Sequence, residues 1–274
     1  MNSKVLKIGI PGAAGRMGAT LIDIIASDNR VELIAATEVS GHPSIGSDAG
    51  SVAGLKPLGL VIQGSADEMF EAADAVIDFT LPETTENHLR LAEKHKTILI
   101  IGTTGVDETK EPLFESSAKT IPIVRAPNMS LSVNLLFAIT EQVARTLDAN
   151  YDIEIIEMHH RYKVDAPSGT AIGLGKAAAR GRGSILEEIS VKARDGITGE
   201  RERGTIGFSS LRGGDVVGDH SVIFAADGER LELSHKSASR HTYARGAVTA
   251  ALWANDQSAG LYTMQDVLGF KQDN

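Results

Sequence analysis

The stretch "VLKIGIPGAAGRMG" (residues 5–18) decides the fold, because it joins a strand-like run to a helical pattern through a glycine-rich turn. Its glycines, Gly12, Gly15 and Gly18, have the spacing G-x-x-G-x-x-G. In such turns one glycine makes the tight bend, one lets the backbone approach a pyrophosphate, and one lets helix and strand pack closely. Backbone amides at the positive end of the helix then bind the phosphates. Several glycines also occur at ordinary helix starts, so the turn alone does not establish dinucleotide binding.

The sequence after the turn supports dinucleotide binding. A second strand-like run, "VELIAAT" (31–37), leads to Glu38, which lies twenty residues after Gly18. An acidic side chain at this distance meets the ribose hydroxyls of the adenosine half. A carboxylate favours NADH, since it would repel the 2′-phosphate of NADPH, and position 39 is Val39 instead of a compensating arginine. With Arg16 as the one nearby cation, the sequence predicts NADH as the preferred cofactor and leaves NADPH use possible.

The rest of the first half alternates strand-like runs with helical patterns. Strands are expected at 74–80, 97–102 and 121–127, helices from Pro82 to about His95 and over 107–119, and an irregular connection over about 41–65. This alternation predicts an α/β fold, a Rossmann-type parallel sheet covered by helices on both faces. Ligands of such sheets bind outside the carboxyl ends of the strands. Gly102, Thr103, Thr104 and Asn128 follow two of these strands and fall where the nicotinamide should lie, although ordinary turns explain them equally well.

The pattern of predicted helices and strands changes after residue 130. A long helix is expected over 130–147, a strand over 151–158, strand-like runs over 185–194, 204–212, 215–226 and 230–236, and a helix over 241–254. An Asp-Gly pair within "ADGE" (226–229) predicts a hairpin. We therefore expect a dinucleotide-binding domain over 1–130, to which 241–274 returns. A second α+β domain, with a mixed, largely antiparallel sheet, is expected over 131–240.

Composition narrows the class of protein. The 274 residues carry a formal net charge of −9, which argues against nucleic acid as the main partner. There is no cysteine, so disulfides, thiolate catalysis and cysteine metal sites are excluded. No apolar run reaches the length of a membrane span, and the N-terminus shows no secretory pattern. A cytoplasmic protein without membrane contact is expected.

The stretch "EMHHRYKVDAPSGTA" (157–171) concentrates polar residues directly after a predicted strand. His159 and His160 would point to opposite faces of a regular strand, so both can line one site only if the strand ends there. Pro167 biases the residue before it away from helix. The sequence therefore predicts that the chain turns here and becomes irregular.

The same stretch predicts an anion-binding helix start. Ser168 is a candidate N-cap for a helix that begins at Gly169. The first amides of that helix, with the hydroxyls of Ser168 and Thr170, would attract a carboxylate, and Lys163 with nearby His160 would add charge. An ordinary helix cap is the alternative for Ser168.

A metal site is the competing interpretation of the histidines, with His159, His160 and Asp165 as ligands. Adjacent histidines chelate one ion poorly, Lys163 would repel it, and the chain has no H-x-x-x-H or H-E-x-x-H motif. No metal is therefore predicted. Beside a hydride donor, histidine and lysine are instead suitable general acids.

These motifs together resemble the 4-hydroxy-tetrahydrodipicolinate reductase family, also called dihydrodipicolinate reductase. The resemblance runs essentially end to end and is most specific at "EMHHRYKVDAPSGTA". The other segments that carry it are "GAAGRMG", "DFTLPE", "GTTG", "APNMS", "RGGDVVGDHSVIFAADGERLELSHKSASR" and "GAVTAALW".

The resemblance implies reduction of a cyclic dicarboxylate, 4-hydroxy-tetrahydrodipicolinate, to tetrahydrodipicolinate by NAD(P)H with loss of water, on the diaminopimelate route to lysine. It implies that His159 is the proton donor and Lys163 a second acid, with His160 and the Ser168-Gly169-Thr170 turn holding substrate carboxylates. The implied cofactor contacts are Gly12, Ala13, Ala14, Gly15, Arg16, Met17, Glu38, Gly102, Thr103, Thr104, Ala126, Pro127, Asn128 and Met129. The family fold implies a Rossmann domain that includes the C-terminal tail, and a sheet domain that builds a homotetramer.

Two positions depart from many members of the family. Val39 replaces a phosphate-binding arginine, which places NADPH use in doubt, and Pro127 lies in the cofactor loop without an evident reason. Another two-domain dehydrogenase is the alternative enzyme, for instance one acting on an aspartate-derived aldehyde. A non-catalytic dinucleotide sensor is the alternative from another class, although a sensor needs neither His159 nor Lys163.

Overall fold

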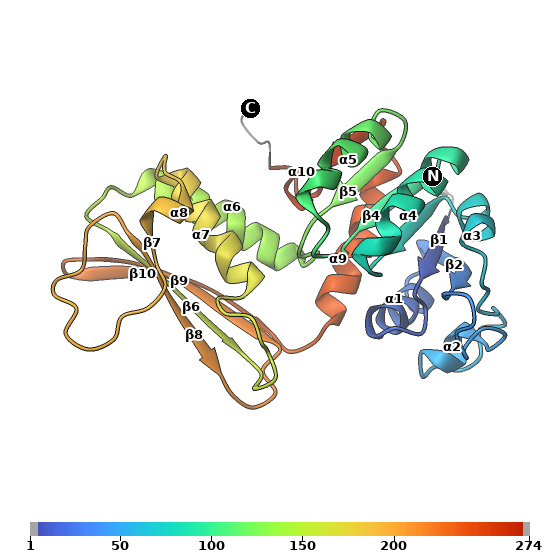
Figure 1. Cartoon of the computed structure of the whole chain (residues 1–274), viewed down its shortest axis with the longest axis horizontal. Coiled ribbons are helices and arrows are strands. Elements are labelled where there is room, and N and C mark those ends of the chain that lie inside the picture. Colours follow the sequence, from blue (N-terminus) through green and yellow to red (C-terminus); the bar gives the residue numbers. More distant parts are fainter. Residues whose placement is uncertain (1–4, 271–274) are drawn as a thin grey trace. The chain divides into compact units, whose positions relative to one another are not determined.

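The computed structural model describes residues 5–270, which form two compact units (Figure 1). One unit holds residues 5–131 and 240–270, and the other holds Ser132–Ser239. The predictions for the extreme N-terminus and for the end of the returning tail, at 1–4 and 271–274, lie outside the described residues. Within the described part of the chain, no helix has the length and hydropathy needed to cross a membrane.

The first unit is built on a parallel six-stranded sheet, as predicted. Its strand order is β2-β1-β3-β4-β5-β11, and every neighbouring pair runs parallel. The strands are β1 (Leu6–Pro11), β2 (Val31–Thr37), β3 (Ala75–Asp78), β4 (Ile98–Ile101), β5 (Pro122–Arg125) and β11 (Gly260–Tyr262). The chain passes from β1 to β2 on one side and then to β3 on the other side of β1. The order therefore reverses beside β1, which makes its carboxyl end the expected ligand crevice.

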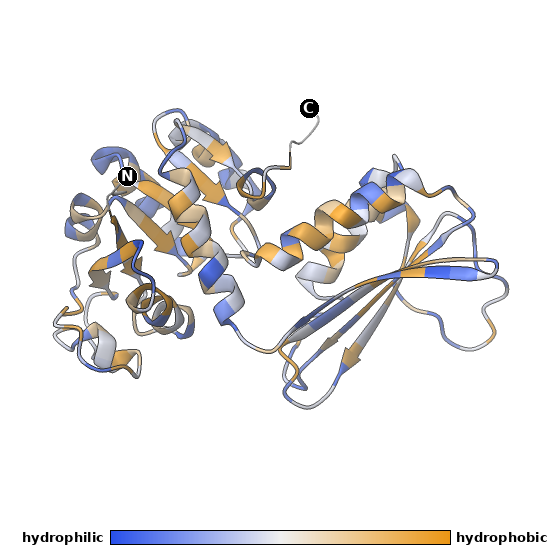
Figure 2. Cartoon of the chain, turned by 180° about the vertical axis from the view of Figure 1, so that it is seen from behind, coloured by the Kyte–Doolittle hydropathy of each residue, from blue (hydrophilic) through white to orange (hydrophobic). Residues whose placement is uncertain are grey.

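Helices cover both faces of this sheet. One face packs against α1 (Arg16–Ala26) and α9 (His241–Ala254), with α10 (Met264–Val267) beside α9. The other face packs against α3 (Ala66–Ala72), α4 (Thr85–His95) and α5 (Glu111–Ser117). Successive strand residues serve opposite faces: in β4, Ile100 packs with α1 and α9, and Leu99 packs with the other three helices. The strands of this sheet are accordingly largely hydrophobic (Figure 2).

Several short elements of this unit differ from the sequence-based expectation. The irregular connection is present, but it contains the one-turn helix α2 (Ala49–Val52), capped by the Asp48 carboxylate. The helices expected from Pro82 and from residue 107 begin as the 3-10 turns η1 (Pro82–Thr84) and η2 (Glu108–Lys110). Helix α3 and strand β11 were not predicted, because their short sequences show no clear period.

The second unit contains a five-stranded mixed sheet with the order β10-β9-β6-β8-β7. Its elements are α6 (Leu131–Thr146), β6 (Asp152–His159), α7 (Gly169–Gly181), α8 (Leu186–Ile189), β7 (Ser190–Val191), β8 (Ile206–Arg212), β9 (Gly218–Ala226) and β10 (Glu229–Ser237). The predicted hairpin joins β9 and β10 through Asp227 and Gly228, with Gly228 at a φ of 86°. Helices α6 and α7 pack against the sheet, so Ile153 and Ile155 of β6 are buried beneath them.

The predicted mixed sheet is present, and one other expectation for this unit needs correction. In the sheet, β10 with β9 and β9 with β6 pair antiparallel over long stretches, whereas β6 with β8 and the short β7 with β8 are parallel. Parallel pairing needs a crossover, and α7 provides one between β6 and β8. The strand expected over 185–194 is mostly wrong, because Leu186–Ile189 is helical and only Ser190–Val191 is strand. Its short apolar run fits either period, which is the usual ambiguity of such segments.

Candidate active site

The glycine turn lies between β1 and α1 and has the geometry that a pyrophosphate site requires. Gly12 has a φ of 67°, a left-handed conformation that favours glycine. A Cβ on Gly18 would overlap the Gly12 carbonyl oxygen and lie 2.8 Å from the Ala13 Cα, so only glycine permits this close packing. Gly15 is the N-cap of α1, without a side-chain cap, and the first turn carries no acid. The amides at this helix start are thus left for an anion.

Glu38 lies directly after β2 and contacts the glycine turn. Its Oε1 accepts a hydrogen bond from the Ala14 amide (2.9 Å), and its Oε2 accepts one from the Val39 amide (3.2 Å). Each carboxylate oxygen keeps a lone pair that could accept a ribose hydroxyl. Val39 is 64% exposed and offers no charge, and Arg16 is exposed at the first position of α1.

The other predicted cofactor residues follow β4 and β5, again at carboxyl ends of parallel strands. Gly102 has no room for a side chain, because a Cβ there would overlap the ring of Phe79. Ala126 and Met129 are buried in the core, so they can offer only backbone atoms to a ligand. Asn128 accepts a hydrogen bond from the Ser130 amide (2.9 Å) at the approach to α6. The remaining predicted residues of these loops are Thr103, which is buried, and Thr104 and Pro127, which are exposed.

A buried carboxylate organises this end of the sheet. Asp78, the last residue of β3, is 1% exposed and contacts His88 Nδ1 of α4 at 2.7 Å. It also accepts hydrogen bonds from the Thr80 amide (2.8 Å) and hydroxyl (2.6 Å), and from the Thr103 hydroxyl (3.3 Å). Burial alone would raise the pKa of Asp78, but the hydrogen bond and charge of His88 outweigh it and lower that pKa. Since Thr80 lies against Gly12, the network joins the loops after β3 and β4 to the glycine turn.

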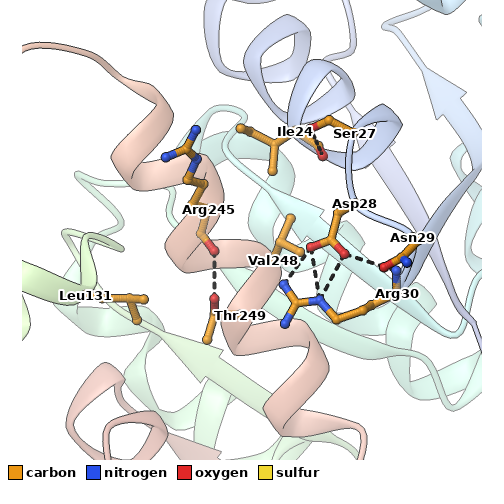
Figure 3. Close-up of a pocket in the computed structure, with 9 residues that line it drawn as sticks. All are labelled: Ile24, Ser27, Asp28, Asn29, Arg30, Leu131, Arg245, Val248 and Thr249. Carbon is orange, nitrogen blue, oxygen red and sulfur yellow. Dashed lines mark hydrogen bonds and ion pairs between the residues drawn. The ribbon is translucent and has the colours of Figure 1, made fainter. Parts of the chain in front are cut away.

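A separate cavity of about 410 Å³ lies at the opposite end of α1 (Figure 3). Residues that follow α1 line it together with α9. Its Asp28 and Arg30 are paired with each other (2.6 Å), and Thr249 donates to the Arg245 carbonyl (3.0 Å). Because it is remote from the glycine turn, it is not part of the expected dinucleotide site.

In the second unit, the candidate histidines lie at the end of β6. His159 is the last residue of the strand and is 8% exposed, and Glu157, two residues earlier on the same face, is 1% exposed. The face that buries Ile153 and Ile155 under the helices therefore ends in two polar residues. His159 Nδ1 lies 2.6 Å from Glu157 Oε2. A Cβ on Gly218 of β9 would lie 3.1 Å from His159 Nε2, so glycine there leaves room for the imidazole ring.

The predicted cap of α7 is present and is linked to the same carboxylate. Ser168 is 2% exposed; its hydroxyl accepts from the Ala171 amide (3.1 Å), and its own amide donates to Glu157 Oε1 (3.2 Å). His220 Nε2 of β9 lies 2.9 Å from the Ser168 hydroxyl. Burial, followed by the charge of His159, lowers the pKa of His220 to about 4, so this ring is neutral at physiological pH.

The loop between β6 and α7 contains the other candidates. The chain leaves the strand at His160, whose amide donates to the Val216 carbonyl (2.7 Å) and whose Nδ1 is buried without a hydrogen-bond partner among residues 5–270. Lys163 Nζ contacts both carboxylate oxygens of Asp165 (2.7 and 2.8 Å). This hydrogen bond lowers the pKa of Asp165. Asp165 is thus paired with Lys163, and no group of three or more potential ligands in the described chain is arranged around a metal position.

Three residues of this site were not singled out from the sequence. Glu157 could have been found, because it precedes His159 by two on a strand and so shares its face. Arg212 and His220 could not, because sheet register brings them in: Arg212 of β8 pairs with His159, and His220 of β9 pairs with Glu157. In the first unit, Asp78 and His88 were missed for the same reason of long-range placement.

A Rossmann-type sheet with a glycine turn at its switch point, joined to a second unit with a buried histidine and an anion-attracting helix start, defines a two-domain NAD(P)H-dependent oxidoreductase. Comparison with known proteins gives the family: the chain belongs to the dihydrodipicolinate reductases. The family's N-terminal model matches residues 6–129, and its C-terminal model matches residues 132–268.

Relatives match the chain over nearly its full length. The 4-hydroxy-tetrahydrodipicolinate reductase of Magnetococcus marinus is 50% identical over 266 residues, covering 97% of this chain and 99% of its own. That of Agrobacterium fabrum is 51% identical over 273 residues, covering 99% of each chain. The solved structure of a dipicolinate-bound dihydrodipicolinate reductase from Paenisporosarcina sp. TG-14 has a TM-score of 0.74 at 22% identity. It covers 96% of this chain and 99% of that one, and so supports the fold.

Proposed function

We propose that the protein reduces 4-hydroxy-tetrahydrodipicolinate to tetrahydrodipicolinate with NAD(P)H and loss of water, in lysine biosynthesis through diaminopimelate. The observation that carries this proposal is the end of β6, where a buried histidine, a lysine and an open helix start lie within one short segment. About 50% identity to reductases of that name over nearly the whole chain supports it.

The residues of the second unit suit the two tasks of this reaction. The substrate carboxylates would be held by His160, Ser168, Gly169 and Thr170. Apart from its chain neighbours and its own helix backbone, Gly169 has no atom of residues 5–270 within 4 Å of where its Cβ would be, which favours an open helix start. The buried Nδ1 of His160 has no hydrogen-bond partner among the described residues, and this supports a binding role, because such an atom is costly unless a ligand satisfies it.

We propose His159 and Lys163 as the proton sources. A reduced nicotinamide supplies the hydride that replaces the hydroxyl on carbon, and one proton joins the departing hydroxyl to form water. His159 is held in place by the 2.6 Å contact between its Nδ1 and Glu157 Oε2. Lys163 would need to exchange Asp165 for a substrate group.

We propose that the first unit binds the cofactor through the glycine turn, Glu38 and the loops after β4 and β5. The uncapped start of α1 and the glycine-only packing at Gly18 fit a pyrophosphate. NADH preference follows from Glu38 and from the uncharged, exposed Val39. Comparing kcat/KM for NADH and NADPH tests it, and a strong preference for NADPH would count against it.

The decisive experiment is NADH oxidation with the cyclised adduct of pyruvate and aspartate semialdehyde. Turnover is expected for the purified full chain without added metal. If the protein is folded and binds NADH but does not turn over this adduct, the proposed reductase activity is refuted. That result would favour either another two-domain dehydrogenase or a dinucleotide sensor.

We also propose a cytoplasmic homotetramer assembled through the second unit. Strand β10 is an edge strand, is largely exposed, and carries Leu231 at 42% exposure. Unpaired edges of this kind are normally covered. Light scattering coupled to size exclusion is expected to give four chains, and a monomer at micromolar concentration would contradict the proposal.

A further inference from the structure

Glu157 is surrounded by hydrogen-bond donors on every side that the structure describes. Its Oε2 contacts His159 Nδ1 (2.6 Å) and accepts from one Arg212 nitrogen (2.8 Å). Its Oε1 accepts from the other Arg212 nitrogen (2.9 Å) and from the Ser168 amide (3.2 Å). The side chain is 1% exposed. A buried carboxylate of this kind is tolerated only because each oxygen is satisfied by donors and a guanidinium balances its charge.

These contacts determine which ring nitrogen of His159 carries hydrogen. Burial would raise the pKa of Glu157, but hydrogen bonds from Arg212 and His159 outweigh it and lower that pKa to about 2. The ionised carboxylate can only accept, so the Nδ1 of His159 must carry a hydrogen. Nε2 is then the ring nitrogen that Glu157 does not contact.

We propose that Glu157 is a positioning residue that couples the proton source to the carboxylate-binding turn. Through Oε2 it fixes the tautomer and orientation of His159. Through Oε1 it holds the Ser168 amide, and hence the start of α7, at a set distance from that imidazole. This inference rests on the proposed function, since it assigns a supporting role to a residue that touches neither substrate nor cofactor.

His220 completes the arrangement from the other side of Ser168. The Ser168 hydroxyl already accepts from the Ala171 amide. Nδ1 of His220 is buried with no partner within the described chain, and an unsatisfied N–H there would be more costly than an unsatisfied lone pair. The hydrogen of this neutral ring therefore belongs on Nε2 and is donated to Ser168. The Ser168 hydroxyl hydrogen is then left to be donated to an anion at the helix start.

The test is Glu157→Gln, with Glu154→Gln as the matched control. Glu154 lies on the same strand, also accepts hydrogen bonds from arginines (Arg194 and Arg201), and points to the opposite face. In Glu157→Gln one amide oxygen replaces two carboxylate oxygens, so the side chain can accept from His159 or from the Ser168 amide but not from both. Its NH₂ group must then face the remaining donors, and the charge that balances Arg212 is lost. We expect kcat to fall on the order of 10²-fold, KM to rise severalfold, and the NADH Kd to stay within twofold. Glu154→Gln is expected to keep kcat within twofold.

A measurement on the unmodified protein keeps the proposal testable if Glu157→Gln does not fold. Long-range ¹H–¹⁵N spectra of histidine-labelled protein, with His159 assigned through His159→Gln, report which nitrogen carries hydrogen when the ring is neutral. Hydrogen on Nδ1 is expected. Hydrogen on Nε2, or a Glu157→Gln variant with wild-type kcat, overturns the inference. Absence of wild-type turnover would instead refute the proposed function, while the tautomer could still be measured.

Discussion

The buried ring of His220 gives a quantitative prediction for the pH dependence of stability. Its pKa falls from 6.5 to about 4 on folding, through burial and then the charge of His159. Below pH 6.5 the unfolded chain therefore binds a proton that the folded chain excludes. The contribution of His220 to the free energy of unfolding must therefore fall as pH drops from 6.5 toward 4 and become flat below that window. Linkage between these two values gives a loss of about 2.5 kcal/mol by pH 4.5 from this one group.

Urea unfolding at fixed protein concentration, between pH 7.5 and 4.5, measures this loss. His220→Gln keeps a donor at the position of Nε2 and removes the titrating ring, so its stability should fall by about 2.5 kcal/mol less than that of the wild type over the window. His42→Gln, in the irregular connection after β2, is the control for loss of a histidine and should follow the wild type. If His220→Gln and the wild type lose equal stability between pH 6.5 and 4.5, the assignment of a neutral, buried ring is wrong.

Three further substitutions test other parts of the structure. Gly18→Ala places a methyl group against the backbone of the glycine turn, so the NADH Kd should rise at least tenfold, by analogy with overpacking costs of about 1–3 kcal/mol. Gly64→Ala, where the nearest atom is 3.4 Å away, should leave that Kd within twofold, and equal values for the two variants would contradict the packing argument. Lys163→Ala and His159→Ala should each lower kcat on the order of 10²–10⁴-fold in steady-state assays, and near-wild-type kcat in both would reject their acid roles. Asp78→Asn should lower the free energy of unfolding by about 3 kcal/mol, because it replaces a buried carboxylate that His88, Thr80 and Thr103 contact. A loss below about 1 kcal/mol in urea unfolding would show that this carboxylate is not needed.

The parts of the fold that were predictable from sequence are those with local causes. The glycine turn, the Ser168 cap and the Asp-Gly hairpin each depend on a few adjacent residues whose backbone preferences are strong. The parallel sheet was predictable because strand and helix periods alternate along the first half. By contrast, the strand expected over 185–194 was wrong, since tertiary packing decides between two periods that the short run fits equally.

The candidate site was predictable only along one stretch of chain. His159, Lys163 and Ser168 share a motif, whereas Arg212 and His220 are brought in by the pairing of β6 with β8 and β9. No local pattern specifies that register. The motif also gives no sign of which polar groups are buried. It does not indicate that hydrogen bonds from Arg212 keep Glu157 ionised, or that burial keeps His220 neutral.

The first unit is made of two chain segments separated by Ser132–Ser239, and this affects how the chain folds during synthesis. One face of its sheet is covered by α1 and by α9, and the inward side chains of α9, such as Ala247, Val248 and Ala251, are at most 1% exposed. Helix α9 leaves the ribosome only after Ser132–Ser239 has been made. During synthesis the sheet face that α9 covers therefore stays partly exposed until α9 is made. The inserted unit, Ser132–Ser239, can complete its own core before that. We expect truncation before residue 240 to give an aggregation-prone chain, since exposed apolar surface of this kind drives misassembly.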